Sequence, residues 1–119
     1  REDLKKFFLN HDCKYNSIKC YSSEIVKPDL KQFFSFMKNH HNTIITFYSS
    51  MTARAFTDYV LKKNVKEFCK KKKFIVISDK VKDELLKLGK LSIYVSETPD
   101  QKNMINLIRY HYFKEKNIG

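Results

Sequence analysis

Two features of the chain predict an α/β protein in which a parallel β-sheet is flanked by helices. Short apolar runs that are typical of strands alternate with segments in which apolar residues recur at helical spacing. The links between them span only about two to six residues, as in compact α/β units. Because a helix lies between consecutive strands, the strands are expected to be parallel and to share one sheet. The predicted strands cover residues 17–22, 43–48, 73–77 and 91–95.

Helices are predicted over residues 2–10, from Pro28 to about residue 39, over about 50–63, over about 79–88, and from Pro99 onward. Each carries an apolar stripe at helical spacing. The residues of these stripes form the expected core: Leu4, Phe7 and Phe8; Leu30, Phe33, Phe34 and Met37; Ala53, Phe56, Tyr59 and Val60; Val81, Leu85 and Leu88; Met104, Leu107, Ile108 and Tyr112.

Several residues mark the expected helix ends. Pro28 suits the first position of a helix, and Gly89 is expected to end the helix over 79–88 in a left-handed conformation. The last helix is expected to open with a capping box in which Thr98 caps, Pro99 takes the first position and Gln101 bonds back.

The charge balance points to an anionic partner. The 119 residues include 24 Lys and Arg against 13 Asp and Glu, a net charge of +11. Such a charge favours nucleic acid, acidic membranes or polyanionic small molecules. The only dense basic run is Lys70–Lys73, and the other lysines are spread as on ordinary solvated helix faces. A codon bias toward A and T would also enrich lysine, so the charge alone does not select a partner.

Several classes of chemistry are excluded by composition. The only glycines are Gly89 and Gly119, so the chain has no glycine-rich phosphate loop. The three cysteines show no CxxC spacing, which argues against a disulfide framework or a zinc ribbon and favours a reducing compartment. His40-His41 is interpreted as solvent-exposed rather than metal-binding. No apolar run reaches the roughly 18 residues that span a membrane. The positions concerned are Cys13, Cys20, Cys69, His11, His40, His41 and His111.

Serine follows each predicted strand, at Ser22-Ser23, Ser49-Ser50, Ser78 and Ser96. The carboxyl ends of parallel strands meet at one edge of a sheet, where ligands bind, and a helix N-terminus there suits an anion. Serine is also simply a good N-cap residue, and both interpretations stay open. Tyr21 and Tyr48 stand beside these serines, where each could face a ligand or close the core.

Four stretches resemble motifs of the uroporphyrinogen-III synthase family. Residues 45–50 (ITFYSS), followed by Ala53 and Phe56, resemble the family's TFTS strand and the helix after it. Residues 75–89 (IVISDKVKDELLKLG) resemble its IG..TA..L...G segment, and residues 95–100 (VSETPD), with Met104 and Leu107, resemble its A..PT...L...I ending. Upstream, Arg1 to Tyr21 is similar to the R..L...L...G..V....VY stretch. The resemblance covers nearly the whole chain and the second half of a typical synthase.

The resemblance implies a flavodoxin-like parallel sheet flanked by helices, as part of a two-lobed synthase fold with the substrate between the lobes. Residues 1–20 would close one lobe, residues 21–27 would connect the lobes, and residues 28–119 would form the C-terminal part of the other. It implies a lyase of tetrapyrrole biosynthesis, the source of porphyrins and heme. This enzyme cyclises hydroxymethylbilane with loss of water and inversion of ring D, and it needs no metal or cofactor.

The resemblance also assigns site residues by position. Tyr21 matches the tyrosine of the family's leaving-group step and would be catalytic. Substrate would be bound by Ser49, Ser50, Met51, Ser78, Lys80 and Val81. The chain departs from the family pattern where Ser78 replaces a glycine and where Val81 and Asp100 replace threonines.

Two other functions stay open beside the synthase. One is a small basic RNA-binding module, although the chain has no aromatic-rich RNA-binding strand or glycine loop. The other is a non-catalytic synthase-like domain kept for protein interaction. As a synthase, the protein is expected in the cytoplasm and as a monomer when complete, with hydroxymethylbilane as partner and neither nucleic acid nor a membrane.

Overall fold

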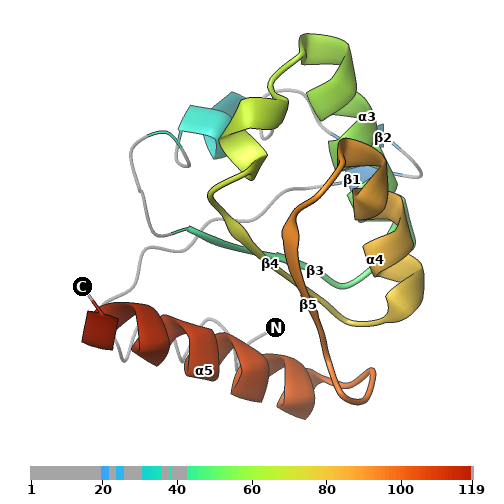
Figure 1. Ribbon diagram of the computed structural model, residues 1–119. Coiled ribbons are helices and arrows are strands. Elements are labelled where there is room, and N and C mark those ends of the chain that lie inside the picture. The colour runs from blue at the N-terminus through green and yellow to red at the C-terminus, as the bar shows by residue number, and fades with distance from the viewer. Residues whose placement is uncertain (1–19, 22–23, 26–30, 36–37, 39–42, 119) are drawn as a thin grey trace.

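Three parallel strands in the order β3–β4–β5 form the central sheet (Figure 1). The computed structural model describes residues 20–21, 24–25, 31–35, 38 and 43–118. The strands are β3 (Ile44–Phe47), β4 (Lys73–Val76) and β5 (Ser92–Val95), and each pairs in parallel with its neighbour. The predicted parallel sheet flanked by helices is confirmed.

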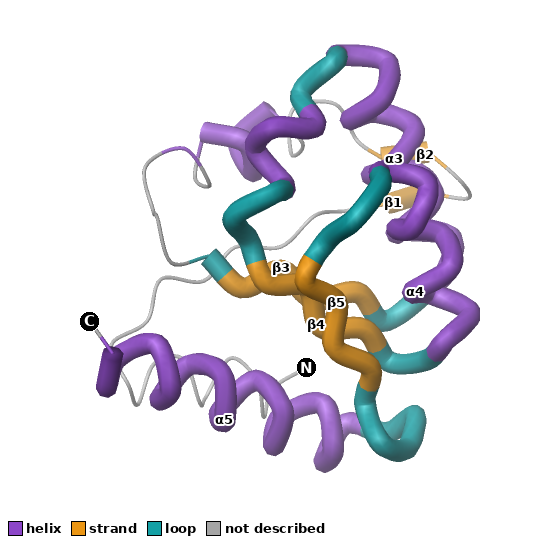
Figure 2. Tube along the Cα trace, in the orientation of Figure 1, coloured by secondary structure: helices purple, strands orange, loops and turns teal. Residues whose placement is uncertain are grey.

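Helical segments connect the strands and cover both faces of the sheet. The first connection holds α3 (Ser50–Lys63) and the 3₁₀ helix η1 (Lys66–Cys69), and the second holds α4 (Asp79–Leu85) and the 3₁₀ helix η2 (Leu86–Leu88). The last helix, α5 (Gln101–Ile118), follows β5. Figure 2 shows α3 and α4 on one face of the sheet and α5 on the other.

Alternation along the strands divides the core between these two faces. On β3 and β4, Ile45, Phe47, Phe74 and Val76 pack in one cluster with buried residues of α3 and α4. Ile75 lies between Phe74 and Val76 in sequence and packs instead with Met104 and Ile108 of α5. This is the two-residue period of a strand, and a strand that packs on both faces must be apolar throughout.

Phe56 of α3 is the centre of the larger cluster. Its ring lies 5.2 Å from Phe47, 5.9 Å from Phe33 and 6.0 Å from Phe34, centre to centre. Most of the predicted core is buried as expected, whereas Phe34, Tyr59, Leu107 and Tyr112 are only partly buried. Leu30, Met37 and the predicted helix over residues 2–10 lie outside the described residues.

The prediction that the first strand joins the parallel sheet is wrong for the residues described. β1 (Cys20–Tyr21) pairs antiparallel with β2 (Glu24–Ile25) in a separate two-stranded sheet. The sequence around β1 alternates polar and apolar residues from Ser17 to Cys20, which suits a half-buried antiparallel strand better than a doubly buried one. Pairing with a partner so close in sequence also costs little loop-closure entropy.

The segment predicted as one helix over residues 79–88 changes its geometry part-way. It is α-helical to Leu85 and continues as the 3₁₀ helix η2 to Leu88. Gly89 ends it with φ 97° and ψ −156°. The φ is positive, as glycine allows, but the backbone is not in the left-handed helical conformation that was expected. The division of the chain into lobes stays a prediction.

We predict a large difference between two adjacent leucines. Leu85 is 0% exposed and Leu86 is 48% exposed. Leu85→Ala should lower the free energy of unfolding by about 2–5 kcal/mol, because it opens a cavity in the cluster beneath α3 and α4. Leu86→Ala should change it by less than about 0.5 kcal/mol. Urea unfolding followed by circular dichroism measures both, and equal losses would contradict the assigned core.

Candidate functional site

The turns that follow β3 and β4 meet at the carboxyl edge of the sheet. Phe47 and Val76 form the last residue pair between β3 and β4. Ser49 and Ser78 each follow this pair by two residues, so the two turns begin at the same height on the sheet. The ladder continues past the strands, since Ile77 donates its N–H to the carbonyl of Phe47 at 3.1 Å. The structure therefore brings together two of the predicted substrate-binding turns, Ser49–Met51 and Ser78–Val81.

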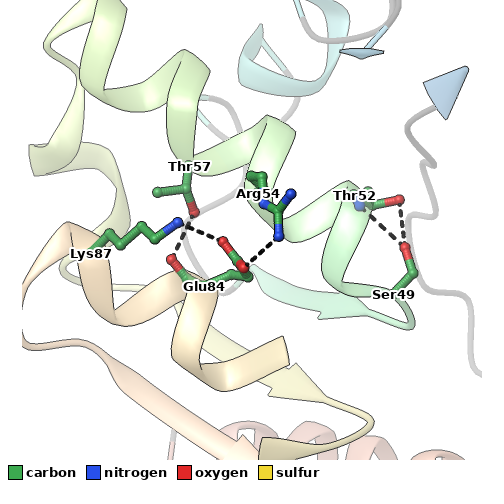
Figure 3. A network of polar contacts seen from close by, with 6 residues as sticks. All are labelled: Ser49, Thr52, Arg54, Thr57, Glu84 and Lys87. Carbon is green, nitrogen blue, oxygen red and sulfur yellow. Dashed lines mark hydrogen bonds and ion pairs between the residues drawn. The ribbon is translucent and has the colours of Figure 1, made fainter. Parts of the chain in front are cut away.

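Ser49 is the N-cap of α3 (Figure 3). Its backbone is extended, with φ −147° and ψ 148°, and its hydroxyl oxygen accepts the N–H of Thr52 at 3.1 Å. The same hydroxyl donates to Oγ1 of Thr52 at 3.0 Å. Among the described residues, the N–H groups of Ser50 and Met51 have no hydrogen-bond acceptor. Ser49 is thus engaged in shaping the turn, and the two amides after it are the groups of this helix end that could donate to an anion.

Ser78 occupies the equivalent position before α4 but makes no capping hydrogen bond through its side chain. An acid, Asp79, begins this helix. Lys80 is exposed, whereas the side chain of Val81 is 2% exposed and belongs to the core. Of the three, Val81 could reach a ligand only through its backbone.

The turn after β5 departs from the prediction. The hydroxyl of Ser96 donates to the carbonyl of Thr98 at 2.6 Å, and α5 is capped by Asp100 instead of Thr98. The carboxylate of Asp100 accepts the N–H of Asn103 at 2.8 Å and the hydroxyl of Thr98. These hydrogen bonds, that of Thr98 first, lower the pKa of Asp100. Aspartate caps as well as threonine does, and here its carboxylate reaches the third amide of the helix, so the predicted capping box is not formed.

The three helix N-termini at this edge therefore differ in charge. The first turn of α3 has no acid, α4 begins with Asp79, and α5 is capped by Asp100. A carboxylate next to a helix N-terminus already neutralises the partial positive charge there. An anionic ligand at this edge is thus best accommodated at α3.

A polar clamp holds α4 against α3 just behind this edge (Figure 3). Glu84 pairs with Arg54 at 3.1 Å and with Lys87 at 2.8 Å, and its carbonyl accepts the hydroxyl of Thr57 at 3.3 Å. The hydrogen bond from Arg54, followed by that from Lys87, lowers the pKa of the Glu84 carboxyl. This clamp joins α4 to α3 behind their first turns.

Tyr48 and Tyr21, the two tyrosines predicted near this edge, lie in different parts of the structure. Tyr48 packs in the cluster beneath α5 with Ile75 and Met104, so it closes the core. Tyr21 lies in β1, whose partner β2 contacts α3. The backbone of Tyr21 therefore runs in the strand pair beside the helix that Ser49 caps. Its side chain lies outside the described atoms, and its catalytic role stays a prediction.

The basic run Lys70–Lys73 does not form one charged face. Lys70 pairs with Glu67 at 3.1 Å, and Lys72 is 7% exposed, with its ammonium donating to the hydroxyl of Thr43 at 3.4 Å. Lys73 lies 3.5 Å from the ring of His111. Lys71 is exposed like Lys70, whereas Lys72 is buried and Lys73 is half-buried. The run therefore does not present four charges together, and an RNA-binding module has less support than the sequence indicates.

Two other candidate groups prove to be structural. Burial raises the pKa of the Cys69 thiol to about 11, which makes it a poor nucleophile. His111 is 3% exposed and its ring lies 4.0 Å from that of Tyr94. Sequence reasoning treated His111 as isolated, although it continues the stripe of Met104 and Ile108 at helical spacing. Within the described ranges, no group of three or more His, Cys, Asp or Glu side chains could hold a metal.

The chain is a parallel α/β protein. At the carboxyl edge of its sheet, the N-terminus of α3 carries no acid. The chain belongs to the uroporphyrinogen-III synthase family, because the family model described as uroporphyrinogen-III synthase HemD matches residues 1–106. No curated protein and no solved structure matches the chain. In the parts of the chain that are described, no helix is both long and apolar enough to cross a membrane.

We predict that the two serines at the edge contribute differently to stability. Ser49→Ala should lower the free energy of unfolding by about 1 kcal/mol, since it removes a capping hydrogen bond. Ser78→Ala should leave it nearly unchanged, because Ser78 makes no such bond. Thermal unfolding of both variants compares them directly. A loss of equal size at Ser78 would show that its hydroxyl also caps.

Proposed function

We propose that this chain takes part in a uroporphyrinogen-III synthase reaction with hydroxymethylbilane as substrate. The match of residues 1–106 to the synthase family is the observation that carries the proposal. The reaction closes the linear tetrapyrrole into a ring with loss of water and inversion of ring D. It belongs to the lyases of tetrapyrrole biosynthesis.

The substrate's carboxylates would bind at the first turn of α3. The N–H groups of Ser50 and Met51 would donate to a carboxylate, and charge-assisted hydrogen bonds of this kind are stronger than neutral ones. Ser49 would support this contact by holding the turn, because its own hydroxyl already bonds to Thr52. The absence of acid from the first turn supports the same placement.

The turn before α4 would contribute less. Lys80 is exposed and could pair with a second carboxylate, and Ser78 has a hydroxyl that makes no capping bond. Val81 would act only through its backbone N–H, since its side chain lies in the core. Asp79 would repel a carboxylate placed directly at the helix end. A substrate held mainly at α3 and steadied by Lys80 fits this distribution of charge.

Tyr21 would act as the acid in the step that expels water. Its phenol would donate a proton to the terminal hydroxyl of the bilane as the carbon–oxygen bond breaks, and the departing group would leave as water. Ring D then forms a carbon–carbon bond to the freed carbon and closes the ring. As the pyrrole regains aromaticity it gives up a proton, which restores the phenol of Tyr21. The remainder of the acceleration would come from holding the linear chain in a folded, reactive geometry.

A single substitution separates ligand binding from stability at α3. Met51 is 41% exposed and is the second residue of the helix. Met51→Asp should leave stability unchanged or raise it by about 0.3–1 kcal/mol, because an acid suits a helix N-terminus. It should nevertheless weaken the binding of uroporphyrin III, a polycarboxylate tetrapyrrole, by about tenfold, because it places a negative charge where a carboxylate binds. Fluorescence titration measures the affinity.

Two controls accompany this titration. Met51→Asn has nearly the same shape as Met51→Asp without the charge and should bind as the native chain does. Asn106→Asp adds the same charge to an exposed position on α5 and should have little effect. If Asn106→Asp weakens binding as much as Met51→Asp does, the overall charge and not the α3 turn attracts the ligand.

The catalytic proposal has its own measurement in the full-length protein. Tyr21→Phe should slow formation of the type III product by about 10²–10⁴-fold, the usual contribution of a positioned acid. Spontaneous closure gives the type I isomer, so the III-to-I ratio should fall. Tyr110→Phe, at a side chain that is 59% exposed on α5, should change neither rate nor ratio. An unchanged ratio in Tyr21→Phe would make Tyr21 a structural residue.

A further inference from the structure

The stretch of chain at the end of α3 opposite Ser49 is strongly basic, and we call it the basic tip (residues 61–71). Its lysines are exposed: Lys62, Lys63, Lys66, Lys70 and Lys71. Glu67 is the one acid within the tip, and it pairs with Lys70. Lys62 and Lys63 stand in the last turn of α3, where they complement the helix dipole, but the dipole does not account for the lysines beyond it.

Apolar side chains are exposed within the same tip. Leu61 is 45% exposed and Phe68 is 38% exposed, although most large apolar residues of this domain are buried. Lys62, Lys63 and Lys66 lie between them in sequence. Exposed apolar side chains among lysines are the composition of surfaces that bind the interface of an anionic bilayer.

The aromatic rings next to the tip argue against stacking with nucleic-acid bases. Phe34 stacks on Phe56 at 6.0 Å and on Tyr59 at 5.5 Å, and Phe68 meets the edge of this group at 6.3 Å from Phe34. The ammonium of Lys63 lies over the ring of Tyr59 at 5.9 Å. Base stacking needs open ring faces. The faces of Phe34 and Tyr59 are largely occupied by each other, by Phe56 and by the ammonium of Lys63.

The types of charged and apolar side chain in the tip also argue against nucleic acid. All five exposed cations of the tip are lysines, whereas arginine is the residue that suits bidentate recognition of nucleic-acid phosphates. Leu61 has no ring to offer a base, but an aliphatic side chain inserts readily among acyl chains. A lipid surface therefore fits the tip better than RNA does.

We propose that the basic tip binds the surface of a membrane rich in anionic lipids. Leu61 and Phe68 insert at the boundary between headgroups and acyl chains, and the lysines contact the lipid phosphates. This surface binding needs no spanning helix. It departs from the expectation, drawn from the resemblance to the synthases, that the protein has no membrane partner.

The position of the tip keeps the candidate site accessible. Ser49 lies at the carboxyl edge of the sheet, and the 14 residues of α3 carry the chain about 21 Å away from it. The tip includes η1 and is followed almost directly by Lys73, the first residue of β4, so it lies at the amino edge of the sheet (Figure 1). A chain bound by its tip would hold the Ser49 turn away from the bilayer.

Co-sedimentation with lipid vesicles tests the proposal. The chain should bind vesicles of phosphatidylcholine with phosphatidylserine and should not bind phosphatidylcholine alone. Lys62→Gln with Lys63→Gln should weaken binding by about 30-fold, given about fivefold for each lysine at an anionic surface. Leu61→Ser should weaken it by about tenfold through lost apolar burial. All three side chains are exposed, so the unfolding midpoint should fall only slightly, through the loss of two cations from the end of the α3 dipole.

Matched variants at the other end of the molecule serve as controls. Met51→Ser changes an equally exposed apolar residue of the same helix, and Lys80→Gln with Lys102→Gln removes two exposed lysines away from the tip. Neither should reduce vesicle binding by more than about twofold. Equal losses in tip and control variants would overturn the proposal. It would also fail if single-stranded RNA bound through Lys62 and Lys63 while anionic vesicles did not bind.

Discussion

The central strand β4 imposes the constraint on which the rest of this structure depends. Phe74, Ile75 and Val76 are each 0% exposed, because helices cover both faces of the strand and a paired strand lies at each side. Successive side chains must then satisfy two different clusters, one beneath α3 and α4 and one beneath α5. Parallel pairing on both sides also makes the three strands end at one level. The carboxyl edge exists as a single surface for this reason.

A serine near the end of a strand has three different roles at the carboxyl edge of the sheet. Ser49 caps α3, Ser78 stands in the cap position without capping, and Ser96 bonds to the carbonyl of Thr98 while Asp100 caps α5. A serine after a strand thus predicts that a turn follows, but it does not predict which hydrogen bond the serine hydroxyl makes. Acids decide which helix end suits an anion. Among the three helices that follow this sheet's strands, α4 begins with Asp79 and α5 is capped by Asp100, whereas α3 has no acid at its cap or in its first turn.

The basic side chains behind the net charge of +11 likewise have different roles in the folded protein. Arg54 and Lys87 hold Glu84 between two helices, and Lys72 is buried beside Thr43. The lysines of the basic tip remain exposed at the far end of α3. One helix consequently joins the two surfaces of greatest functional interest, the Ser49 turn at its N-terminus and the tip at its C-terminus.

By itself the sequence determined the fold class, the three strands of the central sheet and most of the buried residues. Apolar periodicity carries this information, and residues such as Phe56, Val81 and Ile108 keep their predicted places because local spacing selects the buried face. The family was also readable from the order of the motifs, and the match over residues 1–106 confirms it. Only the tertiary structure decided that β1 pairs with β2, that Asp100 caps α5 and that the run Lys70–Lys73 is divided. Each of these depends on which groups meet in space, since a hydrogen bond or an ion pair forms with the nearest suitable partner and periodicity does not encode that partner.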